Sequence, residues 1–156
     1  MKFRILIVAA AVAAVLSSCK SQYEMLLNSN DADLKYEAAF NYYNEGKYSK
    51  AGSLFESLSV LTNGTQRDDT VRFYWGLSNY KFKDYYTAET NFANFLETYP
   101  RSPFASEARY LRLDCLYRST LRWELDQTPT YKAMTEISEY MIEFPKTPHM
   151  QTFRDM

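Results

Sequence analysis

The sequence predicts an all-α solenoid built from helical hairpins, and three observations support this prediction. Aromatic pairs seven residues apart recur at a constant step of 37: Tyr36 and Tyr43, Phe73 and Tyr80, Tyr110 and Tyr117. Apolar residues between these pairs recur at i, i+3, i+4 and i+7, which is the period of amphipathic helices. Glycines and prolines separate the apolar runs. A constant step of this length is typical of proteins in which each repeat stacks on the next.

The N-terminal residues have the pattern of an export signal. Lys2 and Arg4 precede twelve apolar residues at 5–16, and small residues then lead to Cys19, an order typical of bacterial secretory signals. Twelve residues make a helix of about 18 Å, too short for a bilayer core of about 30 Å. We therefore expect residues 1–18 to be removed as a signal peptide.

Residues 16–19, Leu-Ser-Ser-Cys, resemble the lipobox of bacterial lipoproteins. The resemblance implies that the Cys19 thiol receives a diacylglycerol, so that an acyl anchor in the lipid bilayer holds the mature chain and no other cofactor is needed. An ordinary signal peptide with a chance cysteine is the alternative. Lys20 follows the cysteine, where an aspartate would indicate retention in the inner membrane. We expect the periplasmic face of the outer membrane.

Charge and cysteine content exclude several classes of protein. Without Lys2 and Arg4, the mature chain has 16 basic and 19 acidic residues and a net charge of −3, which argues against a nucleic-acid partner. With Cys19 acylated, Cys115 is the only thiol left, so no intramolecular disulfide can form. Stability must therefore come from packing.

The segment at 19–30 is expected to be a lipidated tether, polar except for an apolar cluster at 25–27. The repeat domain is expected over 31–156. Asp31 or Asp33 can cap its first helix, because a short acidic side chain accepts hydrogen bonds from the free amides of a helix N-terminus.

Glycines then separate the first elements of the repeat domain. The first helix is expected to end at about Glu45, since Gly46 favours a helix C-terminus. A second helix is expected from about Tyr48 to the Asn-Gly pair at 63–64, where both residues readily take left-handed turn conformations.

The same unit repeats with small and large residues in register. At the step of 37, Tyr48, Ala51, Phe55 and Leu58 correspond to Tyr85, Ala88, Phe92 and Phe95, and Ala39 corresponds to Gly76. Small residues let paired helices approach closely, while large ones fill the grooves between them. The pattern resembles the tetratricopeptide repeat, and we expect about three repeats at 32–66, 69–102 and 104–147.

The third repeat is longer than the others. Residues 99–104, YPRSPF, are similar to residues 144–149, FPKTPH, which follow 45 positions later instead of 37. We place the extra eight residues of this repeat within 119–129. In each box the first proline is expected to end a helix and the second, Pro103 or Pro148, to be the first residue of the next. Residues after 148 start a further helix, so we expect a chain that is short at its C-terminus.

The sequence contains no recognisable arrangement of catalytic residues, so a non-enzymatic protein is expected. His149 is the only histidine and has no companion ligand nearby in the sequence, which disfavours a metal site. The four glycines form no phosphate-binding loop. Cys115 lies between Leu113 and Leu116 in a helical pattern, which favours a core residue over a nucleophile.

The candidate peptide-binding groove is the face presented by the first helix of each repeat. In tetratricopeptide repeats the fifth, ninth and twelfth positions face the concave surface; here these are Tyr36, Phe73 and Tyr110, then Phe40, Leu77 and Asp114, then Tyr43, Tyr80 and Tyr117. For the rings at the fifth positions, both a packing role and a binding role remain open. The hydroxyl at each twelfth position favours a partly solvated binding surface. The adjacent Lys81 and Arg118 would suit a peptide's C-terminal carboxylate.

The lipobox cysteine, the tether, the repeats, the YPRSPF corner and the turn WELDQTPTYKA at 123–133 together resemble the BamD family, the outer-membrane lipoproteins of the β-barrel assembly machinery. The turn is similar to that of members from Bacteroidetes. The resemblance implies a scaffold whose N-terminal repeats bind nascent outer-membrane proteins, notably their aromatic-ended last strand, and whose later repeats bind the barrel-forming subunit. The alternatives are a cell-envelope coordinator linked to peptidoglycan or division, and an accessory glycan-capture lipoprotein.

Overall fold

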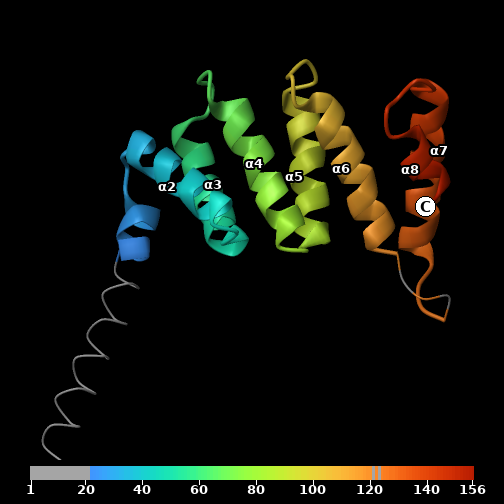
Figure 1. The fold of residues 1–156 in the computed structure, drawn as a ribbon, viewed down its shortest axis with the longest axis horizontal. Coiled ribbons are helices and arrows are strands. Elements are labelled where there is room, and N and C mark those ends of the chain that lie inside the picture. Colours follow the sequence, from blue (N-terminus) through green and yellow to red (C-terminus); the bar gives the residue numbers. More distant parts are fainter. Residues whose placement is uncertain (1–21, 121, 123) are drawn as a thin grey trace, which may run out of the picture.

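The computed structural model describes residues 22–120, 122 and 124–156, so Cys19 and the predicted signal peptide lie outside the described residues. Within this part of the chain the regular secondary structure is entirely helical, and successive hairpins stand in one row (Figure 1). The hairpins are α2 (Ala32–Asn44) with α3 (Tyr48–Leu61), α4 (Asp68–Lys81) with α5 (Tyr85–Thr98), and α6 (Ala105–Arg118) with α7 (Thr128–Glu143), followed by α8 (Met150–Arg154). The predicted helical-hairpin solenoid is confirmed.

The first hairpin begins at the predicted cap. The Asp31 carboxylate accepts a hydrogen bond from the Leu34 amide at 3.0 Å. Gly46 has a φ of 74° and lets the chain reverse into α3 within a few residues. Lys83 occupies the same place in the second hairpin and has a φ of 68°. The two turns therefore have the same backbone form although only one contains glycine.

The core is divided into three buried clusters along the row. Each cluster joins one hairpin to the helices next to it, and the helices contact mainly their neighbours in the sequence. The largest fully buried side chains are those of Phe55, Phe92 and Phe95. Gly76 allows α4 to approach α5, because a Cβ at this position would lie 2.9 Å from the Phe92 ring. The small residue expected at position 76 is thus required by packing.

Residues 22–28, within the segment expected as a tether, form a helix that packs on the first hairpin. Tyr23, Leu26 and Leu27 contact the first core cluster. The buried Lys35 ammonium donates hydrogen bonds to the Leu27 carbonyl at 2.9 Å and to the Ser57 hydroxyl at 2.6 Å. Burial lowers the pKa of Lys35. The packed part of the chain therefore begins before the expected boundary at residue 31.

The proline corners turn as expected, but the helices after them begin later than predicted. Pro103 is not the first residue of α6, which begins at Ala105. The Ser102 hydroxyl accepts the Phe104 amide at 3.3 Å, so one further turn precedes the helix. The second corner repeats this arrangement, and α8 begins at Met150.

The long connection of the third hairpin lies where the sequence places it. It joins the end of α6 at Arg118 to the start of α7 at Thr128, within the predicted interval 119–129. The Asp126 carboxylate accepts hydrogen bonds from the Thr128 amide at 2.9 Å and from the Thr128 hydroxyl at 2.7 Å. These bonds hold the end of the connection against the first turn of α7.

Candidate functional site

The predicted rings of the first hairpin pack against one another and against α4. The ring of Tyr36 lies 4.7 Å from that of Phe40 and is covered by the Arg67 guanidinium at 5.1 Å. Phe40 and Tyr43 both contact Tyr74, at 4.7 and 5.2 Å between ring centroids. Burial, followed by the neighbouring tyrosines, raises the pKa of Tyr43 to about 12. All three predicted rings are partly buried, so packing takes much of their surface.

In the second hairpin the structure removes Phe73 from the predicted binding row. Its side chain is only 4% exposed, and its ring stacks on that of Phe104 at 4.6 Å. Phe104 belongs to the proline corner, which folds over the fifth position of α4. Leu77 is partly buried against the same core cluster. Of the two roles left open for the fifth position, packing is therefore the one that Phe73 fills.

Tyr80, Asp114 and Arg118 form one polar group between α4 and α6. The Tyr80 hydroxyl donates to the Asp114 carboxylate at 2.6 Å, and the Arg118 guanidinium also donates to that carboxylate. Asp114 is buried, while the Arg118 guanidinium lies 5.8 Å from the Tyr80 ring centroid. Burial and the bond to Asp114 raise the pKa of Tyr80. Arg118 is therefore already paired with a carboxylate of its own chain.

Tyr110 is covered by the last turn of the chain. The His149 ring stacks on it at 3.8 Å, and the Phe153 ring contacts it edge-on at 5.6 Å. His149 also lies 3.7 Å from the Glu107 carboxylate. Of the two roles left open for the fifth position, packing is the one that Tyr110 fills.

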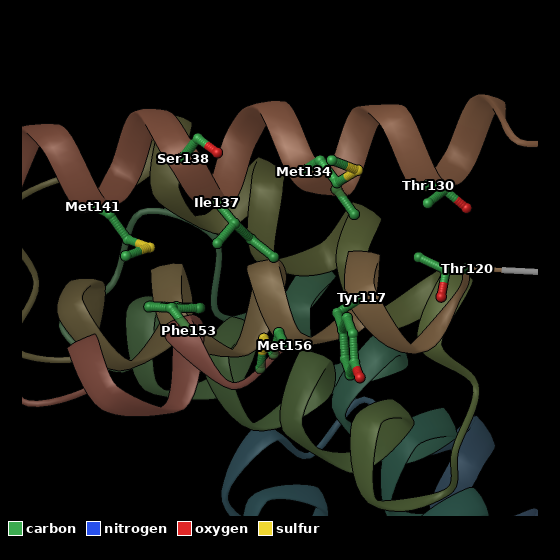
Figure 2. A pocket seen from close by; sticks show the side chains of 10 residues that line it. Tyr117, Thr120, Thr130, Met134, Ile137, Ser138, Met141, Phe153 and Met156 are labelled. Atoms are coloured by element: carbon green, nitrogen blue, oxygen red, sulfur yellow. The ribbon is translucent and has the colours of Figure 1, made fainter.

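Tyr117 is the most exposed ring of the predicted row, at 38%. It lies beside a cavity of about 380 Å³ between α6, α7 and α8. Figure 2 shows side chains of α7 facing Phe153 and Met156 across this cavity. The complete lining is Tyr117, Thr120, Thr130, Ala133, Met134, Ile137, Ser138, Met141, Phe153 and Met156. Tyr117 was predicted from the sequence, whereas the cavity was not, because its lining comes from several elements between residues 117 and 156.

Lys81 lies away from this cavity. It is exposed at the turn between α4 and α5, where it borders a second hollow with residues 46–50 and 82–83. Neither predicted cation lines the cavity beside Tyr117 in the part of the chain that the structure describes: Lys81 borders a different hollow, and Arg118 is paired with Asp114.

The described residues offer no group of three His, Cys, Asp or Glu side chains that could hold a metal ion. Cys115 is fully buried, and burial raises its pKa to about 12, which is the reverse of what a thiolate nucleophile needs. Among the helices that the structure describes, none is long and apolar enough to cross a membrane. The class that the described residues define is a solenoid of helical hairpins.

Comparison with known proteins agrees with this class. Among curated proteins, none matches the sequence significantly. The model of the YfiO family, described as outer membrane lipoprotein, matches residues 28–156. The chain belongs to this family, whose domain is that of the BamD proteins. The protein is located at the outer membrane. The predicted resemblance to the BamD family is thus confirmed at the level of the family, and this family is non-enzymatic.

Proposed function

We propose that the chain is a non-enzymatic, lipid-anchored scaffold of the outer-membrane β-barrel assembly machinery. It binds nascent outer-membrane proteins and partner subunits at the periplasmic face of the membrane. The family match over residues 28–156 supports this role and does not favour an envelope coordinator or a glycan-capture lipoprotein. Cys19 carries the lipid in this proposal, because it ends a lipobox-like segment of a chain that belongs to a lipoprotein family.

The observation that carries the binding role is the cavity beside Tyr117. Its lining is mainly apolar and includes three methionines, whose flexible side chains adapt to different apolar groups. Its volume of about 380 Å³ accommodates one aromatic side chain. We assign this cavity to the terminal aromatic residue of a client's last strand, with Tyr117 contacting the adjoining peptide.

The test is peptide affinity, measured by fluorescence anisotropy on the mature chain made soluble by Cys19→Ser. The ligands are a peptide matching the last strand of an outer-membrane barrel and the same peptide with its terminal aromatic residue replaced by alanine. We expect Tyr117→Ala to weaken binding of the aromatic-ended peptide about tenfold, as loss of an interface aromatic ring commonly does. The alanine-ended peptide should bind weakly to both proteins.

Tyr86→Ala is the matched control, because Tyr86 is 83% exposed on α5 and does not border the Tyr117 cavity. Its affinity for the peptide should equal that of the parent chain. Peptidoglycan fragments and oligosaccharides serve as competing ligands. Binding of the glycans without binding of the strand peptide would reject the proposal in favour of the envelope-linked alternatives.

A further inference from the structure

Two hairpin turns form a lysine-rich edge at one side of the solenoid. Residues 46–50, at the turn from α2 into the start of α3, and residues 81–83, at the end of α4 and the turn after it, line one hollow of about 420 Å³. We call this surface the lysine edge. The exposed ring of Phe82 stands on it. Its cationic side chains are Lys47, Lys50, Lys81 and Lys83.

Carboxylates in the same turns neutralise only part of this charge. Glu45 forms an ion pair with Lys47 at 2.7 Å. Asp84 caps α5 by accepting the Thr87 amide at 3.2 Å. Lys81 and Lys83 form no ion pair with a described residue. The edge is therefore cationic on a mature chain whose net charge is −3.

The lysine edge lies next to the beginning of the packed chain. The Tyr23 hydroxyl donates to the Lys50 carbonyl at 3.2 Å, and the Lys50 ammonium lies 5.2 Å from the centroid of the Tyr23 ring. Figure 1 shows that the helix at 22–28 starts at the same lower edge where α2 meets α3 and α4 meets α5. Cys19 precedes Tyr23 by four residues, which span at most about 14 Å. A lipid on Cys19 thus keeps the bilayer surface close to the lysine edge.

We propose that the lysine edge binds the phosphate headgroups of anionic phospholipids in the leaflet that holds the Cys19 lipid. The lysines supply the charge complementarity, and the exposed Phe82 ring suits the boundary between headgroups and acyl chains. This contact orients the row of hairpins relative to the membrane. The inference rests on the proposed anchor at Cys19.

The test uses the acylated mature chain bound to vesicles. Ser49→Cys places a single reactive thiol on the lysine edge, because Ser49 is exposed there and Cys115 is buried. A fluorescent label on this thiol should be quenched by lipids that carry a headgroup quencher when the vesicles contain phosphatidylglycerol. In vesicles of phosphatidylcholine alone the quenching should be weak. Val60→Cys, 77% exposed near the opposite end of α3, is the matched label position and should not be quenched.

Charge removal then tests the lysines. Each lysine near an anionic surface contributes about fivefold to binding, so Lys81→Gln with Lys83→Gln should lower the docking equilibrium roughly twenty-fivefold. Arg101→Gln with Lys146→Gln removes two exposed charges from the other turns and should leave quenching unchanged. If the protein still floats with vesicles, equal quenching in both kinds of vesicle would overturn the inference. Unchanged quenching after the substitutions at Lys81 and Lys83 would overturn it as well. A protein that floats with neither kind refutes the Cys19 anchor, and the inference with it.

Discussion

Replacing Gly76 with alanine tests whether the close approach of α4 and α5 stabilises the second hairpin. Two effects oppose each other at this position. Alanine favours the helix by about 0.8–1 kcal/mol over glycine in a helix interior. The new Cβ, however, would lie 2.9 and 3.0 Å from two ring carbons of Phe92, whereas carbon atoms pack best at about 3.5–4.0 Å.

The Phe92 ring cannot move away easily. It is fully buried, and Phe73 contacts it at 6.0 Å between ring centroids. Forcing an extra methyl group into such a core costs about 1–3 kcal/mol. We therefore expect Gly76→Ala to lower the free energy of unfolding by about 1 kcal/mol, after the gain in helix propensity has been subtracted.

Gly52→Ala is the matched control in α3. Its Cβ would lie 3.2 Å from the Asn79 side-chain oxygen, and the Asn79 amide nitrogen makes no hydrogen bond to a described residue that would hold it in place. That side chain can shift, so the helix propensity of alanine should leave the protein as stable as the parent or slightly more stable. The assay is urea unfolding of both variants, followed by far-ultraviolet circular dichroism. Equal stability of Gly76→Ala and Gly52→Ala would show instead that the Phe92 ring gives way to the new Cβ at little cost.

Two further predictions concern buried groups. Asp68 is fully buried and accepts hydrogen bonds from Arg72 and Tyr99. Asp68→Ala should therefore lower the free energy of unfolding by about 3 kcal/mol, whereas Tyr99→Phe should lower it by about 1 kcal/mol. Equal losses for the two variants in urea unfolding would contradict this prediction. Burial raises the pKa of Cys115 to about 12, whereas an unfolded thiol titrates near about 8.5. The thiol therefore stays protonated to a higher pH in the folded state than in the unfolded state. The stability that results from this difference is complete below about pH 8.5 and should be lost as the pH rises toward 12. Cys115→Ala should flatten that alkaline decline, and an unchanged slope would show that another group causes it.

The helices could be predicted because their signals are local. The Asp31 cap, the turn at Gly46 and the step of 37 each depend on residues close together in the sequence. The docking of the helix at 22–28 could not be predicted in this way. It depends on the Lys35 ammonium reaching a carbonyl of another element, and a lysine in a helical pattern normally indicates a solvated face.

The candidate site was harder to predict than the fold for a related reason. Phe73 occupies the same repeat position as Tyr36 and Tyr110, yet its burial depends on rings from other elements, those of Phe92, Phe95 and Phe104. The bond from Tyr80 to Asp114 spans 34 residues. The pair has a recognisable pattern: Tyr80 is at the twelfth position of one repeat, and Asp114 is at the ninth position of the next. Because the first helices of adjacent repeats lie close together, this pattern could have indicated the bond.

The contact between Lys35 and Leu27 has a mechanical consequence. Since the Lys35 ammonium holds the last turn of the helix at 22–28 against α2 and α3, force applied through the residues before Tyr23 is delivered to the whole first hairpin. If the proposed lipid on Cys19 holds this end, a small tilt of the first hairpin would move α7 and α8, at the far end of the row, through a longer arc (Figure 1). The Tyr117 cavity lies at that far end.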